Sequence, residues 1–106
     1  MANALGMRAL LPGDLDFAVR AVLPIAPPDR PAMVRQLIQQ ARLAEAHRRQ
    51  TGRAHPKFGT GSLMSAASKW PLTPLPHHYD LAYLAALQTT TQVLIQQLSE
   101  GNPDQH

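Results

Sequence analysis

The sequence predicts an all-α fold, a small helical domain of two long helices and one or two short helices with proline-rich connections. Apolar residues recur every three or four positions in the two longest stretches without proline, which is the period of an amphipathic helix. No stretch alternates apolar and polar residues for long enough to indicate a sheet. The 106 residues suffice for one domain with a thin core, a size at which oligomerisation often adds stability.

Proline and an acidic cap set the bounds of the first predicted helix. Asp14 is placed to cap a helix from Leu15 to about Leu23, which the prolines from Pro24 onward bring to an end. Residues 1–13 precede this cap and residues 101–106 follow the last helix. Both ends of the single domain 1–106 are therefore predicted to be flexible.

The second predicted helix is the longest element and runs from about Arg30 to Thr51. Asp29 stands at its N-cap, Pro31 lies in its first turn, and Gly52 follows its C-terminus. Its apolar residues step by three and four along one face. They are Val34, Leu37, Ile38, Ala41 and Ala44.

Two further helices are predicted in the C-terminal half. Ser62 can cap a short helix that reaches about Lys69. Residues 70–76 contain three prolines and are expected to cross the surface as an extended chain. The last helix is predicted to begin near Asp80 and to end before Gly101.

The last helix carries an apolar stripe close to a heptad pattern, from Leu81 to Leu98. Burial against the helix from Arg30 to Thr51 explains this stripe as well as pairing between subunits does. We predict that part of it forms a partner or oligomer interface. The predicted interface residues are Leu84, Leu87, Thr91, Leu94, Ile95 and Leu98.

Charge is distributed unevenly along the chain. Eight of the ten Lys and Arg residues lie between Arg30 and Lys69, where Glu45 is the one acid. From Trp70 onward there are three acids and neither Lys nor Arg. The basic middle therefore favours a polyanion as partner, whereas the C-terminal third favours a protein.

The basic residues cluster where the second helix ends and the following loop begins. Phosphate groups of a nucleic acid could neutralise this density of positive charge. Cations near a helix C-terminus are also stabilised by the helix dipole, which is a structural explanation of the same residues. No arrangement of two short helices and a basic recognition helix is present, so binding is predicted to ignore DNA sequence. Phe58 lies within the basic loop, whereas Trp70 is expected to pack the short helix onto the core. The predicted nucleic-acid-binding residues are Arg42, Arg48, Arg49, Arg53, His55, Lys57 and Lys69, with His47 beside them.

Neither a catalytic centre nor a cofactor or metal site is predicted. The chain has no cysteine, and its five histidines do not follow a metal-binding spacing. The segment Gly59–Ser62 lacks the Gly-Lys-Ser/Thr ending of a nucleotide-binding loop, and Ser62 and Ser65 lack a recognisable base. A targeting sequence is not evident, and glutamines make membrane insertion of residues 81–99 unfavourable. We therefore expect a non-enzymatic cytoplasmic protein.

Three segments resemble a small protein family encoded in alphaproteobacterial gene transfer agents, the phage-like particles that package cellular DNA. They are Arg8-Ala-Leu-Leu-Pro-Gly-Asp-Leu15, Thr51-Gly-Arg-Ala-His-Pro-Lys-Phe-Gly-Thr-Gly-Ser-Leu-Met64 and Asp80-Leu-Ala-Tyr-Leu-Ala-Ala-Leu87. The family resembled is the small terminase of these particles. The resemblance implies a helical, oligomer-forming adaptor that binds double-stranded DNA weakly and without sequence specificity, and that docks the large terminase.

The chain departs from the usual phage small terminase at its N-terminus. Residues 1–23 are too short for the separate helix-turn-helix domain with which that pattern begins. This departure argues against site-specific recognition. The alternative to a packaging adaptor is a regulatory interaction module whose basic middle meets an acidic protein surface.

Overall fold

The computed structural model describes residues 5–100 and has the all-α architecture predicted from the sequence. Its elements in chain order are α1 (Pro12–Val22), the 3-10 turn η1 (Pro27–Asp29), α2 (Arg30–Thr51), α3 (Leu63–Ala67) and α4 (Leu81–Glu100). Within the described range there is no β-strand, and His55 and Gly59 form an isolated bridge.

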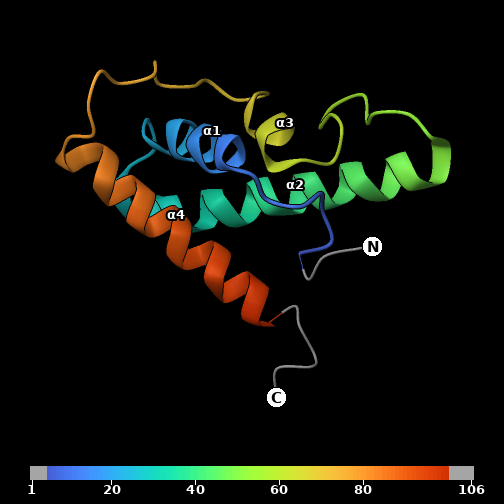
Figure 1. Ribbon diagram of the computed structural model, residues 1–106. Helices are drawn as coiled ribbons and strands as arrows, with labels where there is room; N and C mark the ends of the chain where they lie inside the picture. Colours follow the sequence, from blue (N-terminus) through green and yellow to red (C-terminus); the bar gives the residue numbers. More distant parts are fainter. Residues whose placement is uncertain (1–4, 101–106) are drawn as a thin grey trace.

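Helix α2 is the centre of the fold. The other three α-helices all pack against it, and α1 also contacts both α3 and α4. Figure 1 shows α1 and α3 along one side of α2, with α4 crossing it obliquely. The largest fully buried side chains come from all four helices and from the segment before α1. They are Leu5, Met7, Val19, Val22, Val34, Leu37, Ile38, Leu63 and Thr90.

Helix α2 has the predicted bounds. Gly52 adopts a left-handed conformation with φ +73°, and its N–H donates to the carbonyl of Arg48 over 2.7 Å. A residue without a Cβ is favoured in that conformation, so Gly52 ends the helix as expected. Asp29 occupies the N-cap position, but its side chain makes no capping hydrogen bond.

Helix α1 begins at Pro12, three residues before the predicted start. Asp14 lies in its first turn and not at its cap, and Oδ2 accepts a hydrogen bond from the backbone N–H of Leu11 over 2.7 Å. Oδ1 of the same carboxylate accepts from the N–H of Met64, in the first turn of α3, over 2.8 Å. Because a carboxylate in a first turn can reach back to the N-cap N–H, Asp14 supports two helix starts.

Residues 5–13 differ from the flexible segment that the sequence predicted. Leu5 and Met7 are 2% and 1% exposed and belong to the core. The N–H of Arg8 donates to the carbonyl of Gly61 over 2.9 Å, which fixes the segment beside the loop before α3. Apolar burial and this hydrogen bond hold the backbone in place. Residues 1–4 and 101–106, which that prediction also covered, lie outside the described residues.

The connection between α3 and α4 is irregular, as predicted. Ser62 caps α3 by accepting a hydrogen bond from the N–H of Ser65 over 3.0 Å. Residues 71–76 form neither helix nor strand. Arg20 and Thr73 exchange two hydrogen bonds, from Nε of Arg20 over 2.7 Å and from the N–H of Thr73 over 3.0 Å. These bonds attach the proline-rich segment to α1.

Candidate nucleic-acid interface and apolar groove

Most of the predicted DNA-binding residues lie on the C-terminal half of α2 and on the loop that follows it. Figure 1 shows the loop after α2 turning back toward α3. Gly61 of this loop packs against α2, because a Cβ on Gly61 would lie 2.8 Å from Oε1 of Glu45. A Cβ on Gly59 would lie 3.7 Å from Cε of Lys69, so Lys69 joins the same region although it follows α3. We call the exposed cations Arg49, Arg53, Lys57 and Lys69 the basic edge.

Arg42 is engaged inside the fold and does not belong to the basic edge. Its Nε donates to the carbonyl of Leu5, and its Nη2 donates to Oε1 of Gln97 over 3.3 Å. These contacts connect the segment before α1 and the end of α4 to α2. The charge of Arg42 placed it among the predicted DNA-binding residues, but its guanidinium connects three segments of the fold.

Arg48 and Arg49 share the carboxylate of Glu45. Nε and Nη2 of Arg48 lie 2.7 and 3.1 Å from the two carboxylate oxygens, and Nη2 of Arg49 lies 3.5 Å from Oε2. The hydrogen bond from Arg48 lowers the pKa of Glu45 despite the opposing effect of burial, and the charges of Arg49 and Arg8 act in the same direction. Glu45 therefore stays ionised and partly neutralises these two arginines. Their side chains remain 42% and 47% exposed.

The loop after α2 is held by its own side chains. The backbone N–H groups of Lys57 and Phe58 donate to Nδ1 of His55 over 3.0 and 3.2 Å. The His55 ring stacks on Phe58 at 4.9 Å and meets His47 edge-on at 5.0 Å. His55 was predicted to bind nucleic acid, and in the structure its Nδ1 organises the turn. Arg53 and Lys57 project from this turn as exposed cations.

Close packing explains the glycines before α3. Gly59 and Gly61 have φ of +87° and +98°, and a Cβ on Gly59 would lie 1.7 Å from Oγ of Ser65. That oxygen accepts a hydrogen bond from the N–H of Thr60 over 3.0 Å. The glycines thus let the loop fold tightly onto α3.

Between residues 5 and 100, no group of three or more His, Asp or Glu residues could hold a metal ion.

The predicted interface stripe of α4 is divided between core, groove and solvent. Helix α4 buries a face that includes Leu94 but is otherwise shifted from the predicted stripe, with Tyr83, Ala86, Thr90 and Val93. The shift arises because α4 packs against both α1 and α2. Leu87 and Thr91 are half-buried. Leu84, Ile95 and Leu98 are 46%, 57% and 37% exposed.

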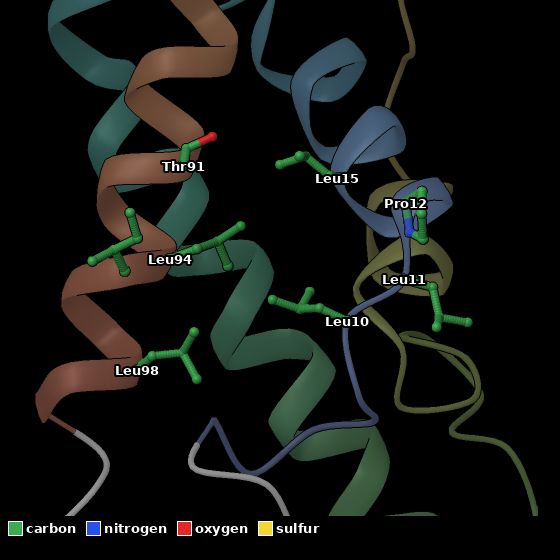
Figure 2. A pocket seen from close by; sticks show the side chains of 8 residues that line it. Leu10, Leu11, Pro12, Leu15, Thr91, Leu94 and Leu98 are labelled. Atoms are coloured by element: carbon green, nitrogen blue, oxygen red, sulfur yellow. The ribbon is translucent and has the colours of Figure 1, made fainter. Parts of the chain in front are cut away.

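An apolar groove lies between α4 and the start of α1. Its volume is about 280 Å³, and Figure 2 shows Leu10 and Leu15 on one side facing Leu94 and Leu98 on the other. Leu10 and Leu15 could not be predicted as groove residues from the sequence, because the contact joins segments about eighty positions apart. The full lining is Leu10, Leu11, Pro12, Leu15, Thr91, Leu94, Ile95 and Leu98.

The hollow surface continues toward the other end of α4. A neighbouring pocket of about 220 Å³ shares Pro12 and Leu15 with the groove and is also lined by Tyr79 and Tyr83. The two tyrosine rings stack at 4.5 Å, and the Tyr83 hydroxyl donates to Oδ1 of Asp16 over 3.0 Å. Burial, followed by this hydrogen bond, raises the pKa of Tyr83 to about 12. The hydroxyl therefore stays protonated and links α4 to α1.

Comparison with known proteins identifies the family. The profile of the domain of unknown function DUF7742 matches residues 8–94. The chain belongs to this family. The DUF7742 region contains the whole basic edge and most of the groove, whereas Ile95 and Leu98 follow it. No curated protein and no solved structure is detectably similar to the chain. In the part of the chain that the structure describes, every helix is too short or too polar to cross a membrane.

Proposed function

We propose that this DUF7742 protein is a small terminase-like DNA-packaging adaptor of a phage-like gene transfer agent. It acts without catalysis in the cytoplasm, binds double-stranded DNA weakly and without sequence specificity, and docks a large terminase. The separation of two surfaces carries the proposal. The basic edge consists of exposed cations on the last turn of α2, on the loop after it and after α3, whereas residues 81–99 of α4 carry no charge and expose apolar side chains beside the groove.

The basic edge suits the backbone of any duplex. Arg53 and Lys57 project from a turn that is fixed internally, and neither makes an ion pair within the described residues. Cations of this kind release counterions when they meet phosphate. The four residues of the edge come from a helix end, a loop and the second residue after a five-residue helix. Such an edge has no recognition helix that could enter a DNA groove, which favours contact with phosphates over reading of bases.

The α4 surface suits a protein partner. Leu84, Ile95 and Leu98 are exposed, and a surface without Lys or Arg approaches a basic protein without like-charge repulsion. The resemblance to small terminases names the two expected occupants, a second copy of the chain and the large terminase. Leu94 lies in the core, so substitution of Ile95 tests this surface with less damage to the fold.

A gel-shift series on unrelated duplexes tests the DNA part of the proposal. Arg53→Gln removes one cation of the basic edge, and Arg35→Gln, the matched control, removes one exposed cation of α2 that lies outside the edge. We expect the slope of log affinity against log salt to flatten by about 0.9 for Arg53→Gln and to remain unchanged for Arg35→Gln. If the two variants flatten the slope equally, DNA binding depends on the net charge of the protein and not on the basic edge. Failure of the wild type to bind DNA would favour the regulatory module that meets an acidic protein.

Light scattering and co-purification with a large terminase test the protein part. Ile95→Asp places a charge beside the groove, and Gln96→Asp places the same charge on an exposed neighbouring position of α4. Ile95→Asp should lower the oligomer mass or abolish co-purification, while Gln96→Asp retains both. Identical behaviour of the two folded variants would remove the groove as an interface.

A further inference from the structure

A small pocket on the side of the basic edge brings together two aromatic residues, one from the loop before α3 and one from the segment after it. Its volume is about 180 Å³, and its lining consists of Gln40, Phe58, Lys69 and Trp70. Helix α2, the loop and the residues after α3 each contribute to it. We propose that this pocket binds an unpaired nucleobase of single-stranded DNA.

The walls of the pocket are organised before any ligand binds. Phe58 is held by the stack on His55 and by the hydrogen bond from its own N–H to Nδ1 of that ring. The indole N–H of Trp70 donates to Oε1 of Gln40 over 3.0 Å. A site that is already ordered loses little conformational entropy on binding, so a small ligand can be held by few contacts.

The lining chemistry matches a nucleotide. Aromatic rings stack on the faces of all four bases, which gives affinity without sequence preference. Because Oε1 of Gln40 accepts from Trp70, its amide NH₂ is left to donate to a base edge. The exposed ammonium of Lys69 provides a partner for the phosphate that accompanies the base.

The surrounding charge favours a nucleotide over a cationic protein side chain. Lys69 lines the pocket, Lys57 precedes Phe58 in the chain, and both cations are exposed. Glu45, the one acid between residues 30 and 69, is already held by Arg48. A cationic side chain would therefore meet like charge, whereas a nucleotide brings an anion.

This inference rests on the proposed function and extends it. Duplex binding by the basic edge needs only phosphates, whereas the pocket needs a base that has left its stack. The pocket would thus add a preference for ends, gaps or opened regions of DNA. This preference is a property that charge alone does not supply.

Trp70 is the single tryptophan of the chain, so its fluorescence reports on the pocket directly. The full chain is titrated with an oligothymidylate of about twelve nucleotides, an abasic oligomer of equal length and a duplex of equal length. Phe58→Leu removes one aromatic wall. Phe17→Leu is the matched control, because Phe17 is the other phenylalanine, is also half-buried, and contacts Arg20 on α1.

Oligothymidylate should quench Trp70, and the abasic oligomer should not. Phe58→Leu should weaken oligothymidylate binding by roughly 5- to 150-fold, the value of one stacked base, and leave duplex binding unchanged. Phe17→Leu should leave both affinities unchanged. Circular dichroism shows whether each variant folds. If Phe58→Leu does not fold, the difference between oligothymidylate and the abasic oligomer in wild-type binding tests the pocket.

Equal quenching by both oligomers, or equal loss of single-strand and duplex binding in Phe58→Leu, would overturn the inference. A change in Trp70 emission with an apolar peptide but not with oligothymidylate would assign the pocket to a protein side chain and also overturn it. Normal duplex binding with no response of Trp70 to oligothymidylate would refute base binding by the pocket and leave the proposed adaptor function intact. Absence of binding to every DNA would remove both.

Discussion

Replacement of Asp14 by alanine should destabilise the protein far more than a single surface carboxylate ordinarily does. The side chain is 3% exposed and accepts two backbone hydrogen bonds, from Leu11 over 2.7 Å and from Met64 over 2.8 Å. These bonds support the first turns of two helices that lie fifty positions apart. Asp14→Ala removes the acceptors and leaves both N–H groups without a partner.

The expected magnitude follows from the two bonds. A hydrogen bond to a charged group contributes about 1.5 to 3 kcal/mol, so the loss of two should lower the free energy of unfolding by about 3 to 6 kcal/mol. Domains of this size are stable by about 5 to 15 kcal/mol in total. At about 4 °C per kcal/mol, the melting temperature should fall by about 12 to 24 °C.

Urea unfolding followed by circular dichroism measures the change. Asp29→Ala is the matched control, because Asp29 stands at the N-cap position of α2, is exposed and makes no capping hydrogen bond. It should alter the free energy of unfolding by less than about 0.5 kcal/mol. Asp14→Asn keeps one carbonyl acceptor, so its loss of unfolding free energy should lie between those of Asp14→Ala and Asp29→Ala. A loss below about 1 kcal/mol in Asp14→Ala, or one no larger than in Asp29→Ala, would refute the double-capping role.

Three further predictions concern buried or engaged polar groups. The hydroxyl of Thr90 is buried and lacks a hydrogen-bond partner among the described residues, so Thr90→Val should raise the free energy of unfolding by about 1 kcal/mol in a urea titration. The lowered pKa of Glu45 means that its stabilisation is complete above its ordinary pKa of 4.5 and is lost as pH falls through the depressed value. The difference in unfolding free energy between wild type and Glu45→Gln should therefore shrink as the pH falls through the depressed pKa of Glu45. A difference that stays constant with pH would contradict the stabilising ion pair of Glu45 with Arg48. Arg42→Gln should lower the melting temperature without changing the salt slope of DNA binding, because its guanidinium holds Leu5 and Gln97 together, and a flattened slope would return Arg42 to the basic edge.

The sequence by itself determined both bounds of α2 and the start of α3, because these bounds depend on residues close together in the chain. Gly52 ends α2 through its own left-handed backbone, and Ser62 caps α3 through the N–H of Ser65, three positions away. The prolines of residues 70–76 exclude helix and central strand whatever surrounds them. The concentration of cations before residue 70 was equally visible in the order of residues.

Tertiary structure decided what each charged or apolar side chain does. Arg42 and Arg53 carry the same charge, but one guanidinium clamps the core and the other is exposed. The start of α1 depends on Asp14, whose second partner lies on α3. Burial depends on which faces meet, so the angle at which α4 packs on α1 and α2, and not its spacing of leucines, placed Leu94 in the core and left Ile95 exposed.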